Sequence, residues 1–227
     1  MQYQFDFSFF ADTWPRFVHG AWLTMQLATA AIVLGFILGA VCALGRTSGS
    51  PGIKRIVGGY VETIRNTPLL VQVFLVYFGL ASLGLKISAE ASAALALTIN
   101  IGAYSTEILR AGIQSVARSQ IEAGECLGLS RLQVYWHIVL LPAVERVFPA
   151  LSSQYVLLML ASSVTSQISA EELTAVANVL QSETFRSFEV YLIVAVIYLI
   201  LSLLFRIAFW GVGQLVFVRR RRLGTPL

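Results

Sequence analysis

Five long apolar runs constrain this chain more than any other feature of its sequence. They cover about residues 21–45, 57–82, 91–113, 147–168 and 190–217. A helix needs roughly 20 mostly apolar residues to cross a bilayer. Only 12% of the residues are charged, about half the share typical of a soluble domain. The runs therefore predict an all-α polytopic membrane protein with about five transmembrane helices.

Basic residues gather in the segments that a five-span chain leaves on one side of the membrane. Cytoplasmic loops of membrane proteins carry an excess of Lys and Arg. We therefore expect this side to be cytoplasmic, with the C-terminus inside and the N-terminus outside. The basic residues of this side are Arg46, Lys54, Arg55, Arg118, Arg131, Arg146, Arg219, Arg220, Arg221 and Arg222.

We expect a single membrane domain over 1–227, since no internal repeat and no linker is evident. Residues 1–19 mix seven aromatic residues with two acids and lack a cleavable signal pattern, which favours an interfacial segment at the outer leaflet. The tail 218–227 holds four arginines and is expected to anchor to anionic lipid at the inner face.

Several classes of function are disfavoured. The basic residues lie at the ends of apolar runs, which argues against binding nucleic acid. Cys42 and Cys126 lie far apart without metal-ligand spacing, so we predict no metal site and interpret both as packing residues. The chain has no G-x-x-x-x-G-K-S/T loop, the phosphate-binding motif of many ATPases.

A polar stretch at 115–146 separates the third and fourth runs. Its centre reads IEAGECLGLSRLQVYWHIVLLPA. Glu122 lies near the start of a predicted short helix, and Ser130 is a plausible N-cap for a second one. The small residues Ala123, Gly124 and Gly128 would allow another surface to approach the backbone closely. We expect two short helices that meet at a glycine turn and form a compact knob below the membrane.

This stretch resembles the cytoplasmic coupling loop of bacterial ATP-binding-cassette (ABC) importer permeases. That loop reads Glu-Ala-Ala, three residues, Gly, nine residues, then Ile-any-Leu-Pro. Here Gly124 replaces the second Ala, and Pro142 comes one residue late. One inserted residue rotates the following helix by about 100° relative to the pattern.

Two further blocks, RNTPLLVQVFLVYFGL and AYSTEILRAGIQSVARSQIEAGECLGLS, resemble the polar amino-acid branch of the same permeases. The resemblance implies the type I importer permease fold in the bacterial inner membrane. It also implies uptake of a polar amino acid or a related solute such as an opine, delivered by a periplasmic binding protein. The expected partners are a second permease subunit, which is the same chain or a related one, and two ATPase subunits that bind ATP and Mg. We therefore expect this chain to need no cofactor of its own and not to be an enzyme. The residues expected to couple to the ATPase are Glu122, Ala123, Gly124 and Gly128.

Polar residues inside membrane spans are costly and commonly mark a solute pathway. Two alternatives remain open: Glu107 and Arg110 are spaced to form an internal ion pair, and hydroxyls can bond back to their own helix. Leu160 and Ala161 stand where the amino-acid branch usually has a Lys and an acid, which leaves the substrate and the choice between homodimer and heterodimer open. The pathway candidates are Asn66, Gln72, Asn100, Glu107, Arg110, Ser162, Ser163, Thr165 and Gln167.

An alternative function is a secondary transporter or channel that works without an ATPase. Such a protein would need its own ion-coupling site and usually more spans or an internal repeat. Neither is evident in the sequence.

Overall fold

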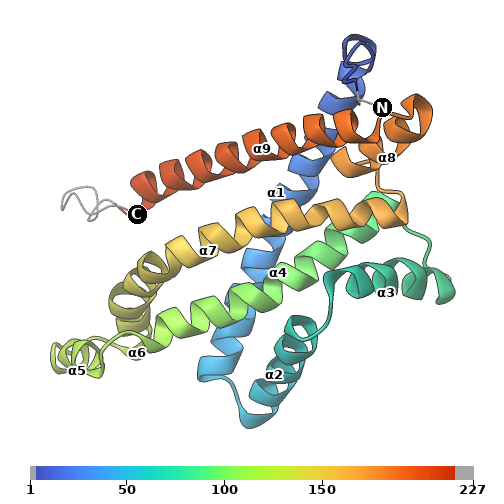
Figure 1. The fold of residues 1–227 in the computed structure, drawn as a ribbon. Coiled ribbons are helices and arrows are strands. Elements are labelled where there is room, and N and C mark those ends of the chain that lie inside the picture. Colours follow the sequence, from blue (N-terminus) through green and yellow to red (C-terminus); the bar gives the residue numbers. More distant parts are fainter. Residues whose placement is uncertain (1–3, 218–227) are drawn as a thin grey trace.

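The computed structural model describes residues 4–217, and these form helices joined by short turns (Figure 1). The N-terminal residues 1–3 and the basic tail 218–227 lie outside the described part. The elements, in order, are α1 Phe10–Ser48, α2 Pro51–Arg65, α3 Leu69–Ser82, α4 Ala89–Gln114, α5 Arg118–Cys126, α6 Arg131–Gln133, the π-helical η1 Val134–Leu140, α7 Leu141–Ala161, the 3₁₀-helical η2 Ser162–Ile168, α8 Leu173–Thr184 and α9 Ser187–Val216.

Each apolar run of the sequence coincides with a helix or a pair of helices. Among the described residues, three stretches are long and apolar enough to cross a membrane, namely Phe10–Ser48, Val134–Ile168 and Ser187–Val216. The pair α2 and α3, bent by 110° at the break between them, makes a fourth if it is one broken span.

Helix α4 is less apolar than these spans because polar residues such as Asn100, Glu107 and Arg110 interrupt it. Its 26 residues give a length of about 39 Å, enough for a hydrocarbon core of about 30 Å. The fifth crossing therefore stays a prediction.

Small residues let α1 and α4 approach each other closely. Gly35 and Gly39 lie one turn apart on α1, and both are buried. A Cβ atom on Gly39 would lie 2.5 Å from the Cβ of Ser105 and 3.1 Å from the carbonyl oxygen of Gly102, both on α4. Spaced glycines of this kind are typical of helix contacts inside membranes, where close backbone packing replaces the hydrophobic effect.

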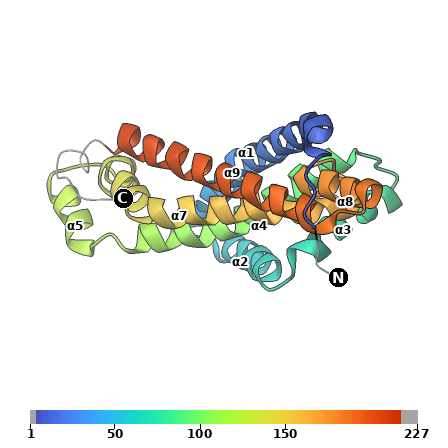
Figure 2. The same cartoon turned by 45° about the horizontal axis from the view of Figure 1, so that its top comes forward.

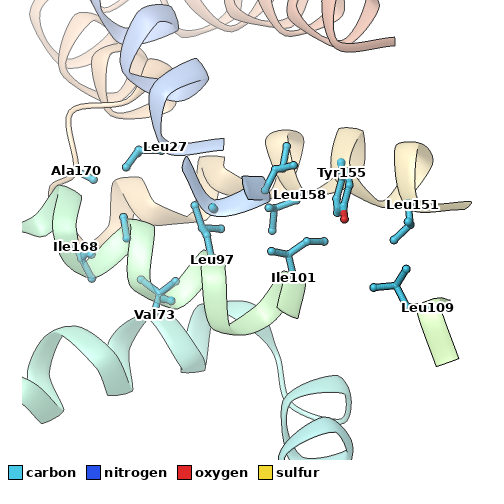
Figure 3. Packing of buried hydrophobic residues seen from close by; sticks show 14 of the residues in the cluster. Leu27, Val73, Leu97, Ile101, Leu109, Leu151, Tyr155, Leu158, Ile168 and Ala170 are labelled. Carbon is cyan, nitrogen blue, oxygen red and sulfur yellow. The ribbon is translucent and has the colours of Figure 1, made fainter. Parts of the chain in front are cut away.

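The main core lies where α4 meets α1, α3 and α7 (Figure 3). Leu97 and Ile101 of α4 are fully buried at its centre, and Leu158 of α7 and Val73 of α3 pack near them. Helix α4 thus lies among three other helices, and its polar residues Asn100, Ser105 and Thr106 are buried there.

The first helix begins earlier than the first apolar run. Residues 10–19, which we expected to form a separate interfacial segment, are the first turns of α1. The reason is burial: Phe17 is completely buried in a second cluster that includes Leu173 of α8 and Val190 of α9. Only residues before Phe10 remain for a separate segment, whose place at the outer leaflet stays a prediction.

A buried carboxylate joins α8 to α1 and α9. Glu172 caps α8 by accepting from the backbone N–H of Ala175 at 3.0 Å. It also accepts from the hydroxyl of Tyr198 at 2.7 Å. The hydroxyl of Thr24 in turn accepts from the backbone N–H of Leu173 at 3.2 Å. Burial raises the pKa of the Glu172 carboxyl above its ordinary value.

Different helices lie at the two ends of the molecule. In both views, α5 and the last turns of α9 lie at one end of the molecule, whereas α8 and the start of α1 lie at the other (Figures 1 and 2). The polar stretch that separates the third and fourth runs is therefore at the same end as the last turns of α9.

Candidate functional site

The glycine turn after α5 is a Schellman motif, in which a left-handed residue ends a helix. Gly128 has φ of +79°, a conformation that side chains rarely adopt. The N–H of Leu129 donates to the carbonyl of Gly124 at 3.2 Å, and the N–H of Gly128 donates to the carbonyl of Glu125 at 2.9 Å. No atom lies within 4 Å of a Cβ built on Gly128. Its observed role is therefore to reverse the chain.

Gly124 packs inside the chain, against η1. It is the buried residue of α5, and a Cβ there would overlap the Cδ1 atom of Ile138 and lie 3.2 Å from Cγ2 of Val134. Glu122 and Ala123, by contrast, are exposed on the same helix. The four residues that we predicted for coupling thus divide into two that shape the knob and two that face outward, and their contact with an ATPase stays a prediction.

The knob has its own small core. Val116, Val134 and Val139 are buried together there, and Ile121 and Leu129 pack against them. Its outer surface is apolar in places, with Leu127 80% and Leu132 67% exposed.

The second half of the knob differs from our expectation of a separate short helix. Helix α6 continues through the π-helical η1 directly into α7. A π-helix bonds i to i+5 and holds more residues in each turn than an α-helix. An extra residue before Pro142 can be accommodated in such a segment, which removes the need for the 100° rotation that an α-helix would require.

The base of the knob is tied to α4. The guanidinium of Arg146, near the start of α7, donates to the carbonyl oxygen of Ser115 and, at 2.8 Å, to its hydroxyl. These contacts join the two ends of the stretch, because Ser115 caps the end of α4 and Arg146 belongs to α7. In the sequence, Arg146 was only one of the basic residues that mark the expected cytoplasmic side, and nothing indicated its contact with Ser115.

A hydrogen-bonded pair holds the break between α2 and α3. Gln72 donates to the carbonyl oxygens of Ile64 at 2.7 Å and Thr67 at 3.0 Å, which the break leaves without helix partners. Asn100 of α4 donates to Gln72 at 2.9 Å. Gln72 and Asn100, two predicted pathway residues, are thus brought together, buried and engaged with each other. Asn66 is exposed and donates to the carbonyl of Glu62 at 2.8 Å.

A polar cavity of about 310 Å³ opens beside this break, between α1, α2 and α4. Glu107 borders it and pairs with Arg46 at 2.6 Å and with Arg110 at 2.7 Å. The predicted pair between Glu107 and Arg110 is confirmed, and Arg46 joins it. The cavity is lined by Arg46, Val61, Glu62, Arg65, Asn66, Tyr104 and Glu107.

Arg65 is the cation at the cavity that stays available to a ligand. Its guanidinium lies 5.5 Å from the centre of the Tyr104 ring, a cation–π contact. With the other described residues it makes no hydrogen bond or ion pair. Glu62 on the same helix is exposed. The cavity thus offers a cation and an acid within a polar wall.

The hydroxyls of η2 are used within their own helix. Ser162 donates to the carbonyl of Met159 and Thr165 to that of Ser162, each at 2.7 Å, and both side chains are buried. Ser163 is half-buried, and Gln167 is exposed with one long contact of 3.5 Å to Ser166. Of the two alternatives for Ser162 and Thr165, the geometry favours bonding to the helix.

Comparison with known proteins identifies close relatives. Residues 31–214 match the sequence model of the family described as binding-protein-dependent transport system inner membrane component. The chain is 34% identical to the probable glutamine ABC transporter permease protein GlnM of Bacillus subtilis over 85% of this chain and 89% of that protein. It is also 34% identical to the nopaline transport system permease protein NocM of Agrobacterium fabrum, over 87% and 86%.

A solved structure shares the whole architecture. The crystal structure of an amino acid ABC transporter with histidines superposes on 97% of this chain and 100% of that chain, with a TM-score of 0.84 and 35% sequence identity. The helical architecture expected from the resemblance, that of the type I importer permeases, is thereby confirmed.

Proposed function

The chain belongs to the family of binding-protein-dependent transport system inner membrane components, and on that premise we propose that it carries a polar amino acid or a related small solute into the cell. Its relatives are amino-acid and opine permeases. In this proposal the N-terminus faces the periplasm and the knob of α5 faces the cytoplasm. A periplasmic binding protein delivers the solute, and a second permease subunit completes the pathway.

The observation that carries the proposal is the tied knob. It has its own core, it is closed by a Schellman turn, and Arg146 fastens its base to α4. A rigid projection of this kind can convert closure of a neighbouring protein into a movement of whole helices.

Two ATPase subunits would supply that closure. The sequence lacks the glycine-rich loop followed by Lys and Ser or Thr that cradles nucleotide phosphates. In this proposal ATP and Mg are bound by the partners, and α5 transmits the effect of hydrolysis mechanically. Glu122 and Ala123 contact the ATPase, whereas Gly124 and Gly128 keep the shape of the contact surface.

The polar cavity supports a zwitterionic solute. Arg65 can pair with a carboxylate and Glu62 with an ammonium group. The ion pairs of Glu107 hold the wall of the cavity in place. A free amino acid carries both groups, which agrees with the substrates in the names of the relatives.

Purification of the assembled complex tests the coupling role. Glu122→Arg places a large cation on the exposed face of α5 and should release the ATPase and abolish uptake. Glu171→Arg is a matched control, since Glu171 is exposed at the opposite end of the molecule. If Glu122→Arg keeps the ATPase bound and transport intact, the coupling role is wrong.

Uptake competition with a panel of amino acids and opines tests the solute. Arg65→Ala should raise the concentration needed for half-maximal uptake, and Arg65→Lys should restore part of the loss. If no amino acid or opine of the panel competes for uptake, the amino-acid assignment is wrong. The coupling role would not be affected by this result, because the purification experiment tests it separately.

A further inference from the structure

An arginine lies inside the most apolar span of the protein. Arg206 belongs to α9, whose best window has a mean hydropathy of 2.7. Its side chain is exposed, and it makes no hydrogen bond or ion pair with the other residues in 4–217. An ionised side chain at this depth is costly and commonly has a functional partner.

A cavity of about 290 Å³, lined in part by Arg206, opens where α7 and α9 meet. Ring contacts hold its walls: Phe148 packs on Phe217 at 5.1 Å, and Tyr155 packs on Phe209 at 5.6 Å between ring centres. The lining is Phe148, Pro149, Ser152, Ser153, Val156, Arg206, Phe209 and Trp210.

The cavity offers polar groups on one wall and apolar groups on the others. The hydroxyl of Ser152 donates to the carbonyl of Phe148 at 2.8 Å, which leaves its oxygen lone pairs free. Ser153 is exposed and has no hydrogen-bond partner for its hydroxyl among the described residues. A guanidinium and a hydroxyl donor that line the same cavity suit a phosphate oxygen.

The depth of Arg206 suits a lipid headgroup. Its Cα lies ten residues before Val216, the end of α9, or about 15 Å along the helix. The whole helix of 30 residues is about 45 Å long and exceeds the hydrocarbon core by about 15 Å. Half of that excess at each end places Arg206 about 7 Å inside the core, within reach of the interface for a long side chain. Trp210, one turn further, is 58% exposed, as expected at headgroup level.

We propose that Arg206, with Ser153, holds the phosphate of an anionic phospholipid from the leaflet on the α5 side, and that the lipid lies in the cavity between α7 and α9. Trp210 and Phe148 pack against its glycerol and upper acyl chains. The lipid neutralises a charge that the protein leaves unpaired within its apolar span.

A second copy of the chain fits this face less well. Beyond Glu145, α7 carries no acid, and beyond Glu189, α9 carries none. Because a twofold contact presents the same surface on both subunits, two copies meeting here would enclose two arginines in an apolar interface to which these parts of α7 and α9 contribute no acid. An anionic lipid can pair its phosphate with Arg206 and pack its acyl chains against the apolar walls of the cavity.

Native mass spectrometry of the assembled complex tests the site. The probes are phosphatidylglycerol and phosphatidylcholine, which share acyl chains and differ in net charge. The wild type should bind phosphatidylglycerol roughly fivefold more tightly, the preference that one basic residue gives near a surface. Arg206→Ala should remove this preference and Arg206→Lys should keep most of it. The matched control is Lys86→Ala, an exposed cation outside the helices.

Ser153→Leu provides a second variant that keeps the charge and fills the cavity, and it should also weaken phosphatidylglycerol binding. Equal binding of both lipids by the wild type, or an equal loss in Lys86→Ala, would overturn the proposal. Displacement of the lipid by millimolar inorganic phosphate would show a free-anion site instead. Separation of the permease pair in Arg206→Ala with lipid binding unchanged would assign Arg206 to a protein contact.

Discussion

The packing of Gly124 against Ile138 gives the sharpest test of how the knob is built. Alanine at position 124 restores the second Ala of the family's loop pattern, yet its Cβ would overlap the Cδ1 atom of Ile138. Overpacking of this kind costs about 1–3 kcal/mol. Alanine also favours a helix over glycine by about 1 kcal/mol. We therefore expect Gly124→Ala to destabilise the knob by about 0–2 kcal/mol, the difference of these two effects.

The compensating change is Ile138→Val, which deletes the overlapped atom. By itself it should cost about 0.5–1.5 kcal/mol through the lost methyl group. In the double variant the overlap is gone and the helix gain of Ala remains. The two changes should therefore be coupled favourably by about 1–3 kcal/mol, which is the cost of the overlap that the double variant no longer has.

Hydrogen exchange of the amides in 118–130 measures the local opening of the knob, because each tenfold loss of protection corresponds to about 1.4 kcal/mol. Gly59→Ala is the matched control, since no atom lies within 4 Å of a Cβ at that position. It should leave protection of the knob unchanged. Strictly additive effects of the two substitutions, or a gain of protection in Gly124→Ala alone, would refute the packing of α5 on η1.

Three further predictions concern other parts of the chain. Cys126 is an exposed thiol in the knob, so a membrane-impermeant maleimide should label it in inverted vesicles and not in intact spheroplasts; the reverse pattern would invert the topology. Glu107→Gln removes the charge that holds Arg46 and should lower the unfolding temperature and slow uptake, whereas Glu62→Gln should leave the unfolding temperature unchanged; equal unfolding temperatures of the two variants would show that the Glu107 ion pairs add no stability. Because burial raises the pKa of Glu172, its contribution to stability is full at low pH and is lost as pH rises through that pKa. Glu172→Gln should therefore flatten the fall in thermal stability as pH rises above about 4, the ordinary pKa of a Glu carboxyl, and an unchanged pH profile would assign that fall to other groups.

Much of the fold follows from the sequence because lipid exposure demands long apolar runs. Helices α1 and α9 are the clearest cases, with mean hydropathies of 2.5 and 2.7 in their best windows. Helix α4 was predicted from its alanine-rich run, but its enclosure was not. The contact between α4 and α1 could have been inferred from Gly35 and Gly39 of α1, whose spacing indicates a close helix contact.

The start of α1 shows what local composition misses. The aromatic residues before position 20 have the composition of an interfacial segment. Their helical state depends on Phe17, which is buried against α8 and α9. Because these helices lie more than 150 residues away in sequence, no local pattern could indicate the contact.

The sequence drew attention to the glycines of the knob but did not indicate their contacts. Gly128 was recognised, and the Schellman turn gives it a physical role. The sequence suggested that Gly124 faces a partner, whereas it packs on Ile138 of the same chain. The extra residue before Pro142 could lie in a loop or in a wider helical turn. The periodicity of the sequence alone does not determine that it lies in the π-helical η1.

The hydrogen bond between Gln72 and Asn100 is another contact that the sequence did not indicate, although both residues were identified. Each residue was identified as a costly polar side chain in an apolar run. Their hydrogen bond depends on the 110° bend between α2 and α3. Pro68 precedes the first residue of α3 and disfavours a continuous helix through the break, but a proline alone does not determine the angle between the two helices.

Disulfide cross-linking in the assembled importer tests the central claim most directly. Ala123→Cys, made together with Cys126→Ser, places one thiol on the exposed face of α5 in the knob. A partner thiol is then scanned along the surface of the ATPase. We expect a cross-link at a defined position that forms in native membranes and whose yield changes when ATP is added. A knob that cross-links to no ATPase, or that reacts only from the periplasm, would contradict mechanical coupling through α5.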